Sequence, residues 1–297
     1  MYNLQVTVIL ASYNHAQYIE QSIHSVLYQT YKNIQLIVID DFSNDGSIGI
    51  LKTIKEKNDF ILLLNEKNEG LNVNILKALN YAKGDFIAFL GSDDYINLNK
   101  IERQVDYLQN TGKDGVFANA QIFDKIKEYP YVPNPLFKRN NKAEILDHLY
   151  KYDWGGALIQ SALFKTSLFK ILAPLRVDFK SDDWAFIIKC YENYEIGYIE
   201  EPLVHYRLHI NNTHKKYWFT FPMRIDIISR IVPEHLRIIS LSNIIHSQGN
   251  YLINDKQLRQ GLRFYMASLF LNFTFKKIWV MVWVTAAYFK NLFKKNV

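Results

Sequence analysis

A regular alternation of short apolar runs with amphipathic stretches over the first 120 residues constrains most strongly how this 297-residue chain can fold. Each run has the length and continuous apolar character of a strand that is buried on both faces. Between the first four runs, apolar residues recur every three or four positions, as in amphipathic helices. Repeated strand–helix–strand units predict an α/β fold with a Rossmann-like, mainly parallel sheet and helices on both faces. The predicted strands are Val6–Leu10, Ile34–Ile39, Phe60–Leu64, Phe86–Leu90 and Val116–Ala118.

The chain is less regular after this region. Three prolines between Tyr129 and Pro135 indicate a loop. The patterns that follow predict helices over 157–172 and 183–193, and two short strands within Gly197–Leu208 that are separated at Glu201–Pro202. The expected organisation is an α/β domain over 1–215, divided into halves of about 1–118 and 119–215, followed by a helical C-terminal region over 216–297.

Cysteine usage and charge narrow the classes of protein. The single Cys190 excludes an intramolecular disulfide and a cysteine-only metal cluster. The first residues lack the basic segment and long apolar stretch of a signal peptide, so we expect a cytoplasmic protein. The net charge is +6, but residues 256–297 hold eight basic side chains and no acidic ones, which leaves the rest of the chain slightly acidic. We therefore expect no nucleic-acid partner.

A polar segment follows each of the first four predicted strands. In parallel sheets, ligands bind beyond the carboxyl ends of the strands, so we expect these segments to meet at one edge of the sheet. That edge is the expected ligand site. The segments are Ala11–Asn14, Asp40–Ser47, Asn65–Gly70 and Gly91–Asp94.

The segment Asp40–Ser47 places three carboxylates and a glycine directly after a buried strand. A fixed Asp acceptor can read a ring N–H donor or a ribose hydroxyl of a nucleotide by hydrogen bonding. The alternative is a polar turn that caps the next helix, with Asp45 or Ser47 as the N-cap.

Asp93 and Asp94 emerge together from the apolar run Phe86–Leu90. Two adjacent carboxylates raise each other's pKa unless a cation lies between them. Mg²⁺ or Mn²⁺ would meet this need and would take its remaining ligands from substrate phosphates. The alternative is a helix N-cap before the helical pattern of Ile96–Leu108.

Two later segments carry further candidate side chains. Ser181–Trp184 opens a helical pattern, so an aspartate there could take a proton from a sugar hydroxyl beside an aromatic wall. Acidic residues in a first helical turn are also simply favourable to the helix dipole. Tyr206–His209, with Asn211–His214 after it, gathers cationic and amide groups that suit a diphosphate or a metal ion. His209 is a candidate ligand, with a structural role as the alternative.

The ordered set of these segments resembles family 2 of the inverting glycosyltransferases, in their bacterial surface-polysaccharide type. This resemblance implies the GT-A fold and runs from about Val6 to His214. Each motif is weak by itself, but their order is specific. The matching elements are Val8–Asn14, Asp40–Ser47, Asn68–Gly70, Lys83–Asp85, Leu90–Asp94, Asp182–Trp184 and Tyr206–His209.

The resemblance implies a nucleotide-sugar donor, a divalent cation (Mn²⁺ or Mg²⁺) that bridges its diphosphate, and a saccharide or lipid-linked saccharide acceptor. Tyr13 would stack near the donor base, and Asp41 would hydrogen-bond it. The implied nucleotide-sugar-binding residues are Ala11, Tyr13, Asp41, Asn68, Gly70 and Asp93, and the implied metal ligands are Asp93, Asp94 and His209.

The resemblance also implies one in-line displacement with inversion of configuration. Asp183 would deprotonate an acceptor hydroxyl, and Trp184 would contact the acceptor. Two departures from the family pattern stand out. Gly91 replaces an Asp that many members have, and Asp182 replaces the usual Glu, so Asp182 stays open as the catalytic base.

Three other functions are consistent with parts of this sequence. A polyprenyl-phosphate sugar synthase shares the donor half but transfers to a phosphate, which is already ionised and needs no base such as Asp183. A non-catalytic nucleotide-binding scaffold is disfavoured because the acidic segments are retained. A dinucleotide oxidoreductase is excluded because no Gly-x-Gly-x-x-Gly follows the first predicted strand.

The C-terminal region carries two apolar stretches, Phe264–Phe275 and Ile278–Phe289, divided by Lys276–Lys277. Each is shorter than the roughly 20 residues that a membrane-spanning helix needs. We expect interfacial helices at the inner face of the cell membrane, with lysines on anionic lipid. The alternative is a helical pair packed on the catalytic domain or in a homo-oligomer. The aromatic residues expected at the headgroup level are Trp279, Trp283 and Tyr288.

Overall fold

The computed structural model describes residues 4–129, 139, 141–152, 158–178, 183–209, 212, 217–254, 256–275, 277–282 and 285–286. The chain forms two compact units. Unit 1 comprises Met1–Lys142 and Gly155–Asn212, and unit 2 comprises Ala143–Trp154 and Thr213–Val297. The last junction lies close to the expected boundary at residue 215, whereas the segment 143–154 belongs to unit 2 and not to the α/β domain.

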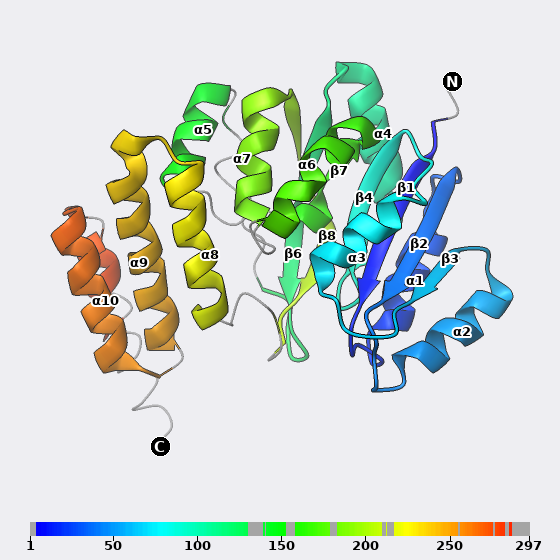
Figure 1. Ribbon diagram of the computed structural model, residues 1–297, viewed down its shortest axis with the longest axis horizontal. Helices are drawn as coiled ribbons and strands as arrows, with labels where there is room; N and C mark the ends of the chain where they lie inside the picture. Colours follow the sequence, from blue (N-terminus) through cyan, green and yellow to red (C-terminus); the bar gives the residue numbers. More distant parts are fainter. Residues whose placement is uncertain are drawn as a thin grey trace. The chain divides into compact units, whose positions relative to one another are not determined.

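Unit 1 is built on an eight-stranded sheet with the order β3-β2-β1-β4-β7-β6-β8-β5 (Figure 1). Strands β3, β2, β1 and β4 are parallel neighbours, and β6 is parallel to β8. Strand β7 is antiparallel to β4 and β6, and β5 is antiparallel to β8. The expected α/β fold with a mainly parallel sheet is therefore confirmed. The bounds are β1 Val6–Ser12, β2 Ile34–Asp40, β3 Ile61–Leu64, β4 Phe86–Gly91, β5 Tyr95–Ile96, β6 Gly115–Phe123, β7 Leu163–Lys165 and β8 Ile196–Arg207.

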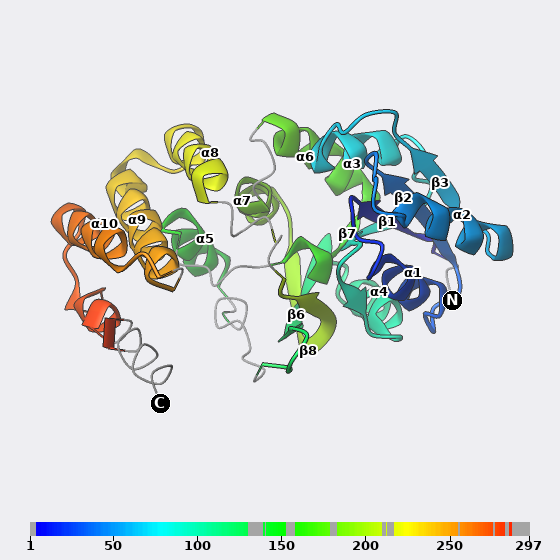
Figure 2. The same ribbon diagram turned by 90° about the horizontal axis from the view of Figure 1, so that it is seen from below.

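Helices cover both faces of this sheet, which explains why β1, β2 and β4 are apolar along most of their length. Helices α3 and α6 pack on one face, and α1 and α4 pack on the other (Figure 2). The amphipathic pattern of α1 places Ile19, Ile23 and Val26 in the core beneath β1 and β4. The helices of unit 1 are α1 Ile19–Leu27, α2 Ser47–Lys57, α3 Leu71–Leu79, α4 Lys100–Thr111, the 3-10 turn η1 Ile159–Ser161, α6 Thr166–Asp178 and α7 Asp183–Asn193.

Two predicted elements of unit 1 differ from the structure. The helix expected over 157–172 is wrong in its first half, where η1 and β7 replace it. Strand β7 pairs with both β4 and β6, and this pairing outweighs the local helical pattern. The two short strands expected within Gly197–Leu208 are one strand, β8. A bulge in its register with β6, where Asn119 lies opposite Pro202, accommodates the proline without ending the strand.

Unit 2 is helical over most of the residues that the structure describes. Its helices are α5 Lys142–Tyr150, α8 Tyr217–Arg230, the turn η3 Glu234–Leu236, α9 Arg237–Asn254 and α10 Leu258–Leu271. Helices α9 and α10 cross closely at Gly249 and Gly261. A Cβ added to Gly261 would lie 2.8 Å from the Gly249 carbonyl oxygen.

The C-terminal stretches differ in one respect from the expected lipid-facing arrangement. Lys277 is buried, and its Nζ donates hydrogen bonds to Ser242 Oγ and to the Asn272 carbonyl oxygen. Lys277 is therefore a packing residue of unit 2, and the expectation that it contacts lipid is wrong. Among the residues that the structure describes, no helix combines the length and apolarity needed to cross a bilayer.

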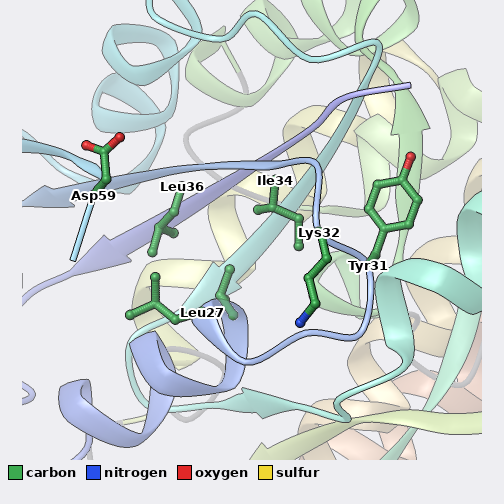
Figure 3. A pocket seen from close by; sticks show the side chains of 7 residues that line it. Leu27, Tyr31, Lys32, Ile34, Leu36 and Asp59 are labelled. Atoms are coloured by element: carbon green, nitrogen blue, oxygen red, sulfur yellow. The ribbon is translucent and has the colours of Figure 1, made fainter. Parts of the chain in front are cut away.

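A small pocket lies between the end of α1 and the start of β2 (Figure 3). Apolar side chains of Leu27, Ile34 and Leu36 line it, together with Lys32 and Asp59. It lies at the amino end of β2, whereas the polar segments follow the carboxyl ends of the strands. None of the expected site residues lines this pocket.

Candidate active site

Strands β1, β2, β3 and β4 end in register at one edge of the sheet. Ser12 of β1 lies beside Asp40 of β2, and Asp40 lies beside Leu64 of β3. On the other side of β1, Ala11 lies beside Gly91 of β4. The polar segments that follow these four strands therefore leave the sheet at the same edge, where a parallel sheet binds its ligands.

The carboxylate of Asp41 is the hydrogen-bond acceptor for the loop that follows β3. It accepts from the backbone N–H groups of Glu69 and Gly70 at 2.8 and 2.9 Å, and from Asn65 Nδ2 at 2.9 Å. Burial acts to raise the pKa of Asp41, but hydrogen bonds, chiefly from Glu69 and Asn74, outweigh it and hold the pKa below its usual value. Asp41 is thus an ionised group that joins the loops after β2 and β3.

Gly70 and Asn68 shape this same loop. Gly70 has a φ of 88° directly before α3, a conformation that favours glycine. Asn68 Nδ2 donates to the Asp41 carbonyl oxygen at 3.4 Å. The structure therefore brings Asn68, Gly70 and Asp41 together, as the sequence motifs lead us to expect.

The other two carboxylates of the 40–47 segment support its turns. Asp40 is buried and accepts from the N–H and hydroxyl of Ser43. Asp45 accepts from the N–H and hydroxyl of Ser47, the first residue of α2, and from the N–H of Ala16. The N-cap of α2 is Gly46, so neither Asp45 nor Ser47 has the expected capping position, although Asp45 supports the turn before the helix.

Tyr13 follows β1, and 47% of it is exposed, so its ring is accessible for stacking. The next residue, Asn14, has a φ of 54°. Its N–H donates to Ser43 Oγ at 2.8 Å, and its side-chain oxygen accepts from the N–H of Asn44 at 2.9 Å. These bonds fasten the loop after β1 to the loop after β2, which places Tyr13 and Asp41 on neighbouring loops.

Asp93 and His209 come together from the loop after β4 and the end of β8. His209 Nε2 lies 2.9 Å from Asp93 Oδ2, and both side chains are largely buried. His15 joins them, and the candidate ligand atoms of the three residues lie within 4.8 Å of one another. Imidazole and carboxylate groups are common ligands of divalent cations, so these residues fit a metal ion. His15 was not singled out in the sequence, because one histidine after a turn has no pattern that marks it.

Asp94 is placed differently from its neighbour. It is 1% exposed; its Oδ1 accepts from the Arg207 N–H at 2.8 Å, and its Oδ2 accepts from Gln160 Nε2 at 3.3 Å. Burial, followed by the charge of Asp93, raises the pKa of Asp94 well above its usual value. Asp94 therefore anchors β8 and η1, and the structure brings only Asp93 of this pair into the cluster with His15 and His209.

Arg207 places a positive charge beside the Asp93 loop. Its Nε donates to the Asp93 carbonyl oxygen at 2.8 Å, and its Nη2 donates to Gln21 Oε1 at 2.6 Å. The guanidinium also lies over the rings of Tyr18 and Phe123, 4.4 and 4.5 Å from their centroids. Because these contacts fix its orientation, Arg207 is suited to a phosphate ligand.

Asp183 is the first residue of α7, and Asp182 lies outside the described residues. Asp183 contributes to the electrostatic environment of Tyr206. Burial and then the negative charges of Asp94, Asp93 and Asp183 raise the pKa of Tyr206.

Trp184 differs from its expected role. Its side chain has no exposed surface, so it offers no wall to a saccharide in this structure. Its burial anchors the first turn of α7 and thereby fixes the neighbouring Asp183. The expectation of direct acceptor contact by Trp184 is not met.

Gly91 explains one departure from the family pattern. A Cβ added at this position would lie 2.6 Å from Asp93 Oδ1, which is too close for both atoms to stay in place. Glycine therefore allows the Asp93 carboxylate to lie where it contacts His209.

Two solved structures share the fold of this chain. Residues 1–349 of S. aureus TarS, solved with UDP-GlcNAc, match with a TM-score of 0.58 and 17% identity over 96% of this chain and 80% of that chain. The mannosyltransferase PcManGT of Pyrobaculum calidifontis, solved with GDP-Man and Mn²⁺, matches with a TM-score of 0.61 and 16% identity over 97% and 81%. The chain spans about half (53%) of a longer TarS structure. These likenesses confirm the GT-A fold that the sequence leads us to expect.

Sequence comparison identifies the family. The model of glycosyl transferase family 2 matches residues 7–171, more than half of the chain. An uncharacterized glycosyltransferase of Methanocaldococcus jannaschii, MJ1057, is 32% identical over 246 residues, which cover 78% of this chain and 76% of that protein. The E. coli UDP-Glc:alpha-D-GlcNAc-diphosphoundecaprenol beta-1,3-glucosyltransferase WfaP is 39% identical over 117 residues, 39% of this chain and 46% of that protein. The chain belongs to glycosyl transferase family 2.

Proposed function

We propose that this enzyme transfers a sugar from a nucleotide-diphosphate donor to a hydroxyl of a saccharide acceptor, with inversion, in the assembly of a surface polysaccharide. The observation that carries the proposal is that the segments holding Asp41 and the Asp93–His209 pair leave the sheet at the same edge. The likeness to WfaP supports a UDP-sugar donor and a lipid-linked saccharide acceptor.

The donor base would bind between the loops after β1 and β2. The exposed ring of Tyr13 would stack on it, and Ala11 would contribute backbone contacts. Asp41 has about four acceptor sites, which its protein partners already occupy. Asn65 and Asn74 also hydrogen-bond each other at 2.6 Å, so one of these amides can give way to a ring N–H of the base.

The transfer would proceed as one displacement. Asp183 accepts the proton of the acceptor hydroxyl while that oxygen forms a bond to the anomeric carbon. The bond from the anomeric carbon to the diphosphate oxygen breaks, and the nucleotide diphosphate leaves with the electron pair. The charge of Arg207 would stabilise this leaving group. A divalent cation held by Asp93 and His209 would supply further charge neutralisation.

We also propose that unit 2 attaches the enzyme to the inner face of the cell membrane. Large apolar side chains of its C-terminal part are exposed: Phe270 by 93%, Phe275 by 82% and Trp279 by 67%. Residues 256–297 carry basic and no acidic charges, a composition that favours anionic lipid. Such attachment would bring the active site to a lipid-linked acceptor.

Replacing the proposed base tests the function. The full-length enzyme is incubated with UDP-, GDP- and TDP-sugars and a lipid-diphosphate-linked N-acetylglucosamine analogue, and release of nucleotide diphosphate and formation of product are measured with and without EDTA. Asp183→Asn is expected to lower product formation by about 10²–10⁴-fold, because it removes the proton acceptor. Its affinity for the donor nucleotide should stay at the wild-type value.

Asp59→Asn is the matched control, since Asp59 is fully exposed and pairs only weakly with Lys55 at 3.5 Å. It should transfer sugar at the wild-type rate. Full activity of Asp183→Asn would contradict the assigned base. Transfer to a polyprenyl phosphate in place of a sugar hydroxyl would favour the sugar-phosphate synthase, and nucleotide binding without turnover would favour a scaffold.

A further inference from the structure

We propose that the divalent cation is held by His15 together with Asp93 and His209, and that Asp94 is not a ligand. This inference rests on the proposed function, in which a cation accompanies the donor diphosphate. It adds a ligand from the loop between β1 and α1, and it changes the chemical character of the site from oxygen-rich to imidazole-rich.

The separation of the candidate ligand atoms fits one ion. Ligands about 2.1 Å from an ion lie about 3 Å apart when they occupy neighbouring positions, and about 4.2 Å apart on opposite sides. The distance between His209 Nε2 and Asp93 Oδ2 is 2.9 Å, and one candidate ligand atom from each of the three residues lies within 4.8 Å of the other two. Side-chain movements of less than about 1 Å would therefore complete the site.

The protein fixes the orientation of the His15 ring. The ring Nδ1 lies 2.8 Å from the hydroxyl of Ser92, and the backbone N–H of His15 donates to Ser47 Oγ at 3.2 Å. Metal-bound histidines commonly direct their second ring nitrogen to such a partner. Ser92 is buried and directly precedes Asp93, so one short segment both orients His15 and supplies the carboxylate. The ring of His15 meets that of His209 edge-on, with centroids 5.5 Å apart.

The contacts of the Asp94 carboxylate stabilise the fold. Both of its oxygens accept hydrogen bonds, from the Arg207 N–H and from Gln160 Nε2. Ligation by Asp94 would break contacts that hold β8 and η1. A site of two imidazoles and one carboxylate should also favour Co²⁺ over Mg²⁺, because Mg²⁺ prefers oxygen ligands.

Metal binding by the full-length protein tests this inference without relying on turnover. Co²⁺ is titrated and followed by its visible absorption, with Mg²⁺ as competitor, and imidazole nitrogen is detected by the electron spin-echo modulation of bound Mn²⁺. We expect Co²⁺ to bind at least tenfold more tightly than Mg²⁺. His15→Gln should weaken Co²⁺ binding at least tenfold and reduce the nitrogen modulation.

Three further variants make the result specific. His24→Gln removes a histidine on α1 that stacks on Tyr28, and Asp94→Asn keeps an acceptor for Arg207; both should bind Co²⁺ as the wild type does. Ser92→Ala, which leaves every ligand in place, should weaken binding less than His15→Gln, and it serves if His15→Gln does not fold.

Wild-type binding and unchanged nitrogen modulation in His15→Gln would overturn the proposal, as would loss of binding in Asp94→Asn. Sugar transfer that persists in EDTA would show that the reaction needs no divalent cation. That result would contradict the metal site but not the glycosyltransferase function. Cobalt binding through His15 without turnover of any donor would leave the metal site standing and count against the proposed function.

Discussion

At the scale of single residues, Lys100 is a fully buried lysine at the start of α4. Its Nζ donates to the Ala162 carbonyl oxygen at 3.4 Å, a long hydrogen bond. Burial lowers the pKa of Lys100 to about 7, because the charged form loses its hydration. The unfolded chain holds this lysine at its ordinary pKa of about 10.5.

This difference makes stability depend on pH. Between about pH 7 and 10.5 the unfolded chain keeps a proton that the folded chain has released, so the free energy of unfolding rises with pH across this window. Lys100→Met should remove this dependence. From pH 7.5 to 9, the wild type should gain about 2 kcal/mol relative to the variant in denaturant unfolding.

Lys52→Met is the control, since Lys52 is exposed on α2. Its stability should run parallel to that of the wild type over the same pH range. A Lys100→Met curve that is also parallel would show that the amine is charged in the folded protein.

The residue scale also shows what the sequence could and could not predict about the site. The polar segments that hold Asp41, Asp93, Asp183 and His209 were predicted, because each follows or opens a recognisable element. The different contacts of Asp93 and Asp94 were not predicted, because the partners of Asp94 come from distant parts of the chain. His15 was not predicted, because a single histidine after a turn belongs to no pattern that marks it as a ligand.

At the scale of elements, the crossing of α9 and α10 depends on two glycines. A Cβ on Gly261 would lie 2.4 Å from Ile253 Cγ1 as well as close to the Gly249 carbonyl oxygen. A backbone oxygen cannot move as easily as a side chain, so the helices would have to separate. Glycine has a low helix propensity, so its presence in both helices at this crossing is explained by their close packing.

Gly261→Ala is expected to destabilise unit 2 by about 1–3 kcal/mol because it overpacks the crossing. Gly49→Ala provides a matched helical glycine with nothing within 4 Å of its added Cβ, and it should be neutral or stabilising by up to about 1 kcal/mol. Urea unfolding followed by circular dichroism measures both. Equal stability of the two variants would show that α9 and α10 can separate at no cost.

Element types were predictable where a pattern was long. The strands of the first half of unit 1 are apolar on both faces, and this pattern identified them. Strand β7 has three residues, and its neighbours β4 and β6 fix it through long-range pairing. A strand of this length resembles part of a helical pattern, because the strands that pair with it lie far away in the sequence.

At the scale of the whole molecule, charge and exposed apolar surface are unevenly distributed along the chain. The basic excess lies in residues 256–297, and Phe270, Phe275 and Trp279 in the same range are among the most exposed large apolar side chains. The carboxylates of the site all belong to unit 1. The proposed donor site and the proposed membrane contact therefore belong to different units.

The double variant Phe270→Ser, Phe275→Ser should bind vesicles of phosphatidylglycerol and phosphatidylcholine at least tenfold more weakly than the wild type, because each phenylalanine contributes apolar burial of about 1.5–3 kcal/mol. Flotation in a sucrose gradient measures this partition. Ile126→Ser, a control at a residue of unit 1 that is 91% exposed, should float as the wild type does. A change in sedimentation without a change in flotation would instead assign the aromatic surface to a homo-oligomer.

The hydrogen bonds of Asp41 have a consequence for binding thermodynamics. Because this carboxylate fastens the backbone of Glu69 and Gly70 to the end of β2, the chain itself restricts the loop. The conformational entropy lost in ordering the loop then enters the free energy of folding and not that of ligand association. A nucleotide would meet a preorganised surface, and its affinity would depend on the contacts that it forms there.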